Sequence, residues 1–297
     1  MEKTYNYRKG FGAMAVCYLI WGFQPLYFAL DTEIDITFTL ACRIIWAGVT
    51  CLVILAFQHK LGELAAVFRD RKILIREITA AVLLFADWAI YLFAIRSGKV
   101  MQCAMGYYIM PLVMFFFGAV IFREYINRKH FIALAFIVAG IVLSAEGFGG
   151  FPSVTISLSL CFAVYSAIKK ALKVDSIVST AAEILILAPF ALLYVLLFAK
   201  GENALPGVTW TRQLFIIGSG IVTGLPLVLF AVGVRYLPLS MTGIMQYVSP
   251  TLGIICSLIL GESFTKEKLI SFVFIWIGVI IYAVNTYSDI RSGERTG

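Results

Sequence analysis

Long apolar runs with few charges dominate this chain of 297 residues. The run at residues 100–122 contains no charged side chain, and it is long enough to cross a bilayer core, which takes about 20 apolar residues in a helix. Hydrophobic residues make up 61% of the chain and charged residues only 14%, against about 45–50% and about 25% in soluble domains. The chain therefore cannot fold as a soluble domain. Runs of this length also exclude a transmembrane barrel, whose strands are short and alternating.

Ten such runs divide the chain into candidate membrane-spanning helices. Their ranges are 10–30, 35–57, 73–95, 100–122, 130–146, 153–172, 177–199, 212–234, 240–261 and 267–287. Most connections between them are short, so consecutive helices are expected to lie antiparallel beside one another. The sequence thus predicts an all-α polytopic membrane protein with ten transmembrane helices.

One longer connection and the carboxyl-terminal end fall outside this pattern. The segment from His59 to Lys72 carries apolar side chains at helical spacing and charges on its other face, which is typical of a short helix lying on a membrane surface. The apolar residues are Leu61, Leu64, Ala65 and Phe68. Residues 288–297 are polar and are expected to form a disordered cytoplasmic tail.

The 24 lysine and arginine residues are divided unequally between the two sides of this topology. Seventeen fall on the side of both termini, six fall on the other side, and Arg43 lies inside a span. Because cytoplasmic connections carry the excess of lysine and arginine, both termini are expected in the cytoplasm. Contact with anionic membrane lipid then explains the net charge of +7, and no nucleic-acid partner is predicted.

The residues that most often carry catalysis or bind metal show no functional pattern. The six cysteines lie within apolar runs without paired spacing, which is typical of reduced packing residues. His59 and His130 lie at the ends of runs, away from any group with metal-ligand spacing. A membrane enzyme needs a nucleophile with its base, or a metal site. The sequence therefore predicts no cofactor, no metal and no enzymatic activity.

Short sequence matches recur at a nearly constant spacing. Residues 106–112 and 245–251 share Tyr-x-x-Pro at an offset of 139, and two further matches recur at offsets of 137 and 144. A unit of five helices is odd in number, so its second copy enters the membrane from the opposite side, as in many secondary transporters. The predicted domains are residues 1–146 and 147–287, a first and a second, inverted five-helix repeat. The alternative is chance matching between helices of similar composition.

Pro111 and Pro250 lie in the middle of the fourth and ninth predicted spans, at equivalent positions of the two repeats. A proline inside a helix frees a carbonyl one turn earlier and kinks the helix. Freed backbone at membrane depth faces protein or a water-filled cavity. We therefore expect both prolines near the midplane and close to a cavity between the repeats, with simple packing kinks as the alternative.

Several motifs together resemble a known transporter family. In the second half they are Gly220-Ile-Val-Thr223-x-x-Pro226-Leu, Leu239-Ser240-x-x-Gly243-x-x-Gln246-Tyr247-x-x-Pro250-Thr251-Leu and Gly261-Glu262. Elsewhere they are Arg43-x-x-Trp46, Trp88, Gly106-Tyr-x-Ile-x-Pro111-Leu, Lys169-Lys170 and Glu183. From the first helix to the tenth, the chain resembles the RarD-type transporters of the EamA family, in the drug/metabolite transporter superfamily. The resemblance implies a ten-helix inner-membrane carrier built from two inverted repeats.

Three charged residues lie well inside the predicted spans: Arg43, Asp87 and Glu183. A charge there costs roughly 2.5–3.5 kcal/mol on insertion scales and usually faces a partner or a pathway. Arg43 and Asp87 both lie about 12 Å below the outer face at 1.5 Å per residue, so they can form a pair. Glu183 is the repeat equivalent of Arg43, and as a lone acid it could take up a proton. We expect all three to be gating or coupling groups, the alternative for Arg43 and Asp87 being a bridge that only fixes packing.

Aromatic and polar side chains away from the ends of the spans are candidates for a substrate cavity. The commoner role of tryptophan and tyrosine in membrane proteins is an interfacial belt. The predicted cavity residues are Trp46, Trp88, Tyr91, Tyr108, Pro111, Tyr165, Gln246, Tyr247 and Pro250.

These features favour a secondary transporter that moves a small organic metabolite or drug-like solute by alternating access. The alternative is an uncoupled facilitator or channel-like pore for small metabolites, although a channel needs a continuous polar lining. Proton coupling and uniport both fit the sequence, so the predicted partners are a small-molecule substrate, membrane lipid and, for a coupled carrier, a proton.

Overall fold

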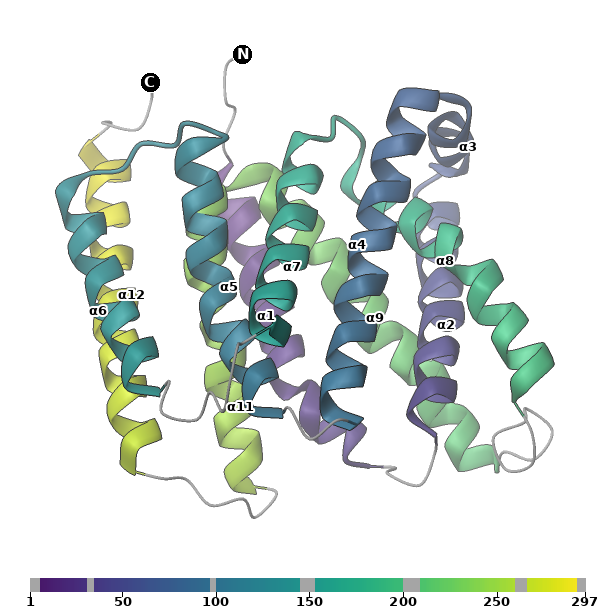
Figure 1. Ribbon diagram of the computed structural model, residues 1–297. Helices are drawn as coiled ribbons and strands as arrows, with labels where there is room; N and C mark the ends of the chain where they lie inside the picture. The colour runs from purple at the N-terminus through teal and green to yellow at the C-terminus, as the bar shows by residue number, and fades with distance from the viewer. Residues whose placement is uncertain are drawn as a thin grey trace. The chain divides into compact units, whose positions relative to one another are not determined.

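The computed structural model describes residues 6–30, 35–96, 100–144, 153–199, 209–259 and 266–292, and every regular element in these ranges is a helix (Figure 1). The helices are α1 (Tyr7–Phe28), α2 (Ile36–Phe57), α3 (Leu61–Arg69), α4 (Arg71–Arg96), α5 (Val100–Val120), α6 (Arg128–Ser144), α7 (Ser153–Ala171), α8 (Ser176–Phe198), α9 (Trp210–Tyr236), α10 (Leu239–Met245), α11 (Val248–Ile259) and α12 (Lys266–Ser292).

Each predicted span coincides with one helix or, for the ninth, with a pair of helices. Within the described ranges, five helices are long and apolar enough to cross a membrane, namely α1, α2, α7, α8 and α9. Shorter apolar stretches occur at Gly106–Val120 in α5 and Val273–Asp289 in α12. Helices suit this setting because they satisfy all their backbone hydrogen bonds internally, where hydrocarbon offers no partner. The protein is therefore an all-α integral membrane protein.

The ninth predicted span is divided where the sequence suggested only a kink. Helix α10 ends at Met245 and α11 begins at Val248. Pro250 is the third residue of α11, and the first turn of a helix tolerates proline because its N–H groups have no helical acceptor. Pro250 therefore lies at the start of a helix, whereas Pro111 lies inside α5.

The connection after α2 contains the short helix that the sequence predicts, α3. Leu64 and Val67 are buried, and α3 packs on α8. Leu61 and Phe68 remain exposed. Part of its apolar surface is therefore covered by protein rather than left for the membrane.

Helix α12 extends further than the sequence suggests. It continues to Ser292, so residues 288–292, predicted to belong to a disordered tail, are helical. Asp289 is buried, and its Oδ2 accepts a hydrogen bond from Asn127 Nδ2 at 3.1 Å. This contact gives the last turns a partner on another element. The remaining predicted tail, 293–297, lies outside the described residues.

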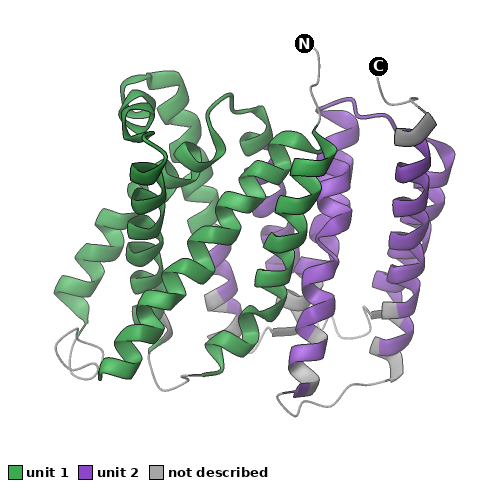
Figure 2. Cartoon of the chain, turned by 180° about the vertical axis from the view of Figure 1, so that it is seen from behind, with its two compact units in different colours: residues 1–86, 168–237 green, residues 87–167, 238–297 purple. Residues whose placement is uncertain are grey.

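The helices form two compact units (Figure 2). Unit 1 comprises residues 1–86 and 168–237, and unit 2 comprises residues 87–167 and 238–297. Each unit therefore draws on both halves of the sequence, and α4 and α7 each contribute to both units.

Unit 1 is built around α9, which packs against α1, α2 and α8, while α8 also packs on α2. Glycines on α9 allow the close approach. A Cβ atom at Gly220 would lie 2.5 Å from the carbonyl carbon of Trp46 and 2.8 Å from the nitrogen of Ala47, which are backbone atoms of α2. Backbone cannot yield as a flexible side chain can, so this crossing requires glycine.

Unit 2 is held by two helix pairs, α5 with α10 and α6 with α12. A Cβ atom at Gly243 of α10 would lie 2.8 Å from the carbonyl oxygen of Pro111. A Cβ atom at Gly278 of α12 would lie 2.5 Å from the carbonyl oxygen of Ala133. Small residues thus bring the backbones together in both pairs, as is usual between membrane helices.

The substitution Gly220→Ala should destabilise unit 1 by about 1–3 kcal/mol, because the added methyl group overpacks the crossing of α2 and α9. Gly12→Ala on α1 is the matched control, since nothing lies within 4 Å of a Cβ atom there. Unfolding in a titration with dodecyl sulfate, followed by tryptophan fluorescence, measures the difference. Equal midpoints for the two variants would contradict the close approach at Gly220.

Candidate functional site

Helix α8 begins with a polar face that is buried in unit 1. Asp175 is its N-cap, and its Oδ1 accepts a hydrogen bond from the N–H of Ile177 at 3.1 Å, a usual role of aspartate at a helix start. Ser179, Thr180 and Glu183 follow within two turns, and all three are buried. Helix α8 therefore presents two hydroxyl groups and a carboxylate to the interior of the unit.

Lys169 in the last turn of α7 occupies this polar face. Its Nζ lies 2.8 Å from Oε1 of Glu183 and donates hydrogen bonds to Oγ of Ser179 at 2.7 Å and Oγ1 of Thr180 at 3.4 Å. The side chains of Lys169 and Glu183 are 2% and 0% exposed. Removing either member of such a pair leaves an uncompensated buried charge, which typically destabilises a protein by about 3–5 kcal/mol.

Glu77 on α4 is the third charged residue at this place. It is fully buried, interacts electrostatically with Lys169 and Glu183, and lies beside Ser179. Glu77, Lys169 and Glu183 form a charge cluster that joins α4, α7 and α8 within unit 1. Two acids share one ammonium group there, so the cluster can change its net charge by binding a proton.

Two further cations, Lys170 beside Lys169 in the sequence and Arg235 on α9, are bonded to backbone carbonyl groups of unit 1. Lys170 donates to the carbonyl oxygen of Leu237, the C-cap of α9, and Arg235 donates to the carbonyl oxygen of Val174 at 3.0 Å. The contact of Lys170 places positive charge at the C-terminal end of α9, where carbonyl groups lack helical partners. The turn between α7 and α8 is thereby attached to the end of α9.

Lys60 ties the start of α3 to the start of α8. Its Nζ lies 2.8 Å from Oδ2 of Asp175, and the two side chains are 28% and 30% exposed. Burial raises the pKa of Asp175, but the hydrogen bonds from Lys60 and from the N–H of Ile177 outweigh it and leave the pKa below its ordinary value. This partly exposed pair lies one helical turn from Ser179 along α8.

Arg43 on α2 is anchored to two other helices of unit 1. Its Nε donates to Oγ1 of Thr223 on α9 at 2.9 Å, and its guanidinium carbon lies 4.7 Å from the ring centre of Phe28 on α1. Trp46, one turn along α2, meets α9 at Gly220. The two residues therefore share the α9 side of α2. Asp87, the predicted partner of Arg43, belongs to unit 2, so their pairing stays a prediction.

In unit 2, the predicted site residues of α4 lie beside α5 and α7. Asp87 is buried and interacts electrostatically with Cys161 on α7. The ring of Tyr91 lies 5.9 Å from that of Tyr107 on α5 in an edge-on arrangement. Trp88 is half-buried. Tyr165 on α7 is fully buried with its ring 5.5 Å from that of Phe162.

The remaining predicted residues meet where α5 contacts α10. The hydroxyl group of Tyr247 donates to the carbonyl oxygen of Tyr108 at 2.9 Å, and Nε2 of Gln246 lies 2.9 Å from the sulfur of Met110. Pro111 lies against Gly243. The structure thus brings Tyr108, Pro111, Gln246 and Tyr247 together, with Pro250 one turn further on.

A second polar cluster, which the sequence did not single out, joins α6 to α12. His130 is buried, and its Nδ1 accepts a hydrogen bond from the N–H of Asn127 at 3.1 Å. Asn285 Nδ2 donates to Oδ1 of Asn127 at 2.8 Å, and the ring of Tyr282 lies 4.7 Å from that of His130. Its members hold one another across the two helices, so the cluster stabilises this helix pair.

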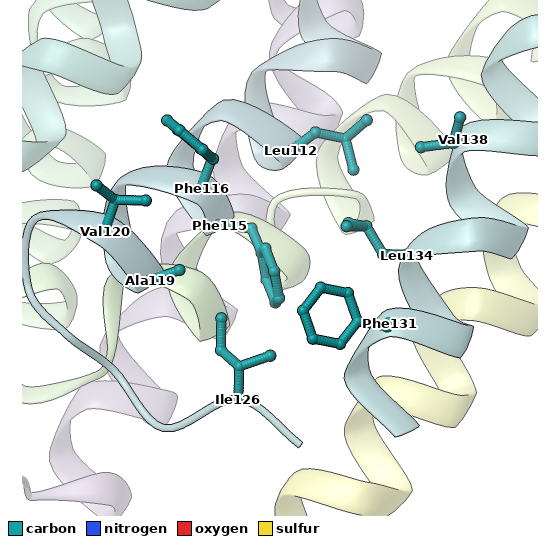
Figure 3. Close-up of a pocket in the computed structure, with 9 residues that line it drawn as sticks. All are labelled: Leu112, Phe115, Phe116, Ala119, Val120, Ile126, Phe131, Leu134 and Val138. Atoms are coloured by element: carbon teal, nitrogen blue, oxygen red, sulfur yellow. The ribbon is translucent and has the colours of Figure 1, made fainter. Parts of the chain in front are cut away.

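A cavity of about 430 Å³ lies between α5 and α6 in unit 2 (Figure 3). Its lining is apolar throughout and consists of Leu112, Phe115, Phe116, Ala119, Val120, Ile126, Phe131, Leu134 and Val138. None of the nine predicted cavity residues is among them. A lining without polar side chains suits hydrocarbon rather than a polar metabolite.

Two of the three charges in the charge cluster are not predicted by the sequence. The sequence predicts a lone acid at Glu183, but Glu183 is paired with Lys169. Lys169 follows an apolar run next to Lys170, so it is one of the seventeen cations that the sequence assigns to the side of the termini. Glu77 was overlooked because it adjoins Arg76 at the edge of a span. The positions of the three residues in the sequence do not indicate that they lie together in the fold.

Five cysteines are free, four of them buried and Cys161 partly buried, as predicted, while the side chain of Cys103 is outside the described part.

Comparison with known proteins shows that the chain is similar to transporters. The sequence profile described as the EamA-like transporter family matches residues 8–145 and 153–284. The chain is 33% identical to "Uncharacterized transporter YojE" of Bacillus subtilis (strain 168) over 96% of its own length and 95% of the relative's. It is 26% identical to "Protein RarD" of Escherichia coli (strain K12) over 97% and 98% of the two chains. A solved crystal structure with 17% identity covers 93% of this chain and 97% of its own at a TM-score of 0.73, which shows a shared fold.

The Lys60–Asp175 pair should contribute little to the free energy of unfolding at neutral pH and nothing in acid. Because the pKa of Asp175 is lowered by folding, its contribution is present above the unfolded pKa and lost as pH falls through the folded pKa. Asp175→Asn keeps the helix cap and should reduce the free energy of unfolding by at most about 1 kcal/mol at neutral pH. Asp175→Ala should reduce it by about 1 kcal/mol more through loss of the cap.

Dodecyl sulfate titrations at neutral pH and below about pH 3 measure both substitutions. In acid the wild type and Asp175→Asn should have the same midpoint. A difference between these two midpoints that grew on acidification would contradict the conclusion that folding lowers the pKa of Asp175.

Proposed function

This chain belongs to the EamA-like transporter family, and from this premise we propose that it is a secondary transporter moving a small organic metabolite or drug-like solute across the inner membrane by alternating access. The observation that carries the proposal is the charge cluster of Glu77, Lys169 and Glu183, buried between three helices. Charged groups inside a membrane protein are costly and usually serve a transport pathway or its coupling.

Packing between equivalent helices supports two inverted repeats, residues 1–146 and 147–287. Helices related by the offset of about 140 residues contact each other in three pairs: α5 with α10, α6 with α12, and α2 with α8. Tyr247 donates a hydrogen bond to the carbonyl group of Tyr108, its equivalent in the first repeat. Two copies facing each other in this way would account for units that each mix both halves of the sequence.

The distribution of cations supports the orientation. Seventeen lysine and arginine residues lie on the side of both termini against six on the other, so we place both termini in the cytoplasm. In this orientation the charge cluster lies toward the cytoplasmic ends of α4, α7 and α8, and Arg43 and Asp87 lie toward the outer face.

Arg43, Asp87 and Glu183 are proposed as gating groups. Glu183 with Lys169 closes the inner side, because their ion pair is stable only while water is excluded, and opening that side must separate or hydrate it. Arg43 with Asp87 closes the outer side by the same logic. The Arg43–Thr223 hydrogen bond fits this role, since it positions the guanidinium group between α2 and α9 without neutralising it.

The proposed substrate cavity uses aromatic and polar side chains, eight of which belong to unit 2. Tyr108, Gln246 and Tyr247 supply a polar face beside Pro111 and the α10–α11 break. Trp46, Trp88, Tyr91, Tyr165 and Pro250 complete the proposed set. Such a lining suits a partly aromatic or amphiphilic metabolite, for which π-faces and a few hydrogen bonds provide recognition.

A thermal-shift screen of the purified protein against metabolites and drugs should identify a stabilising compound, because ligands that bind the folded state raise its stability. That compound, radiolabelled, should show saturable counterflow in proteoliposomes. Counterflow requires a site that alternates between the two sides, so a non-saturable flux without counterflow would favour the facilitator or pore instead.

The substitution Arg43→Ala should reduce folded yield and abolish counterflow, because it leaves Asp87 unpaired. The double variant Arg43→Ala with Asp87→Asn should recover the yield but not the counterflow. Yield from size-exclusion chromatography and initial counterflow rates measure the two effects separately. Strictly additive yield losses in the double variant would show that the two residues do not interact.

A further inference from the structure

We propose that Glu77 is the proton-binding residue of the transporter, and that Lys169 controls its protonation by bonding either to α8 or to Glu77. The inference rests on the transport function proposed above and deepens it by naming the coupling ion. Its premise is the geometry of the charge cluster within unit 1, which joins α4, α7 and α8.

The first step concerns the hydrogen bonds of Lys169. An ammonium group has three N–H donors and no acceptor. Oε1 of Glu183, Oγ of Ser179 and Oγ1 of Thr180 lie 2.8, 2.7 and 3.4 Å from Nζ. These three oxygen atoms all belong to α8, the two hydroxyl groups as hydrogen-bond acceptors and Oε1 of Glu183 as the ion-pair partner, so in this state these contacts of the ammonium group are made to that helix.

The second step concerns Glu77, whose carboxyl group is left beside this arrangement. Both its oxygen atoms are buried, and the groups beside them are the hydroxyl group of Ser179 and the carboxyl group of Glu183. An ionised carboxylate here would exchange its hydration for at most one hydroxyl group, and it would also face the negative charge of Glu183. Glu77 is therefore held as the neutral acid while Lys169 is bonded to α8.

The third step concerns the other groups around Glu77. From α2 the thiol of Cys51 faces Lys169 and Glu183, and from α8 the hydroxyl group of Ser179 faces Glu77. Arg76, its neighbour on α4, is exposed, and Lys60 and Asp175 are bonded to each other. Among the described residues, Lys169 and Glu183 are thus the charged groups that act on Glu77.

The exchange follows from these contacts. When α8 moves away from α7, Lys169 loses its acceptors and its ammonium group can bond to Glu77. The carboxyl group of Glu77 then releases its proton to water, because a nearby cation favours the ionised form. When α8 returns and takes back Lys169, Glu77 recovers a proton from water. One proton is bound and released in each cycle.

Infrared spectroscopy of the protein in liposomes detects this proton directly, since a protonated carboxyl group has its own C=O stretching band that shifts in D₂O. The wild type should show such a band at neutral pH. Glu77→Gln, which imitates the neutral acid and preserves its shape, should fold normally and lose that band. Glu63→Gln on the exposed face of α3 is the matched control and should retain it.

Two further variants test the control by Lys169. Glu183→Gln removes the competing carboxylate, so Lys169 should bond to Glu77 and the band of Glu77 should disappear although Glu77 is present. Lys169→Met removes the cation from both acids, so the band should roughly double. A role in packing alone predicts neither change. An unchanged band in Glu77→Gln, or a retained Glu77 band in Glu183→Gln, overturns the proposal.

Transport then separates this inference from the proposed function. An imposed pH gradient should drive net uptake by the wild type and by the Glu63→Gln control but not by Glu77→Gln, whereas counterflow of the compound identified by thermal shift should occur in the wild type and in Glu63→Gln. Absence of counterflow in the wild type would refute the transporter. Counterflow with a pH-gradient response that survives in Glu77→Gln would refute Glu77 as the coupling residue while leaving the transporter intact.

Discussion

Hydrocarbon offers no hydrogen-bond partner, and the architecture of this protein follows from that constraint. Backbone groups satisfy one another inside helices, and the helices approach closely at glycines such as Gly220 and Gly243. The same constraint applies to charge. Lys169 and Glu183 are removed from water almost completely. They can remain charged there because each neutralises the charge of the other. Glu77 lies beside this pair, and the one ammonium group of the charge cluster is already paired with Glu183.

The sequence predicted the helices well and the charge cluster poorly, for different physical reasons. Apolar runs such as 177–199 reveal a helix because the bilayer sets its length, and α8 indeed occupies Ser176–Phe198. The partner of Glu183 is set by how α7 and α8 pack, which no local pattern encodes. Lys169 and Lys170 are adjacent and chemically identical, yet one turns inward to a carboxylate and the other bonds to the end of α9. A rule that assigns cations to loops cannot distinguish them.

Two positions that the proposed repeats make equivalent have different surroundings. Arg43 and Glu183 are related by the offset of 140 residues, and both lie on helices that pack together in unit 1. Arg43 is bonded to a neutral hydroxyl group and lies over an aromatic ring, whereas Glu183 is bonded to a full positive charge. The two residues proposed for the outer and inner closures therefore have different contacts in this structure.

The Lys169–Glu183 pair also bears on how the protein enters the membrane. The two residues are 14 positions apart on a helical hairpin with a turn of only a few residues. Each charge alone would cost roughly 2.5–3.5 kcal/mol to insert. If α7 and α8 leave the ribosome and partition into lipid as one hairpin, the two charges can neutralise each other before either meets hydrocarbon. The pair would then lower the barrier to biogenesis, and a variant lacking one partner would insert less efficiently than the wild type.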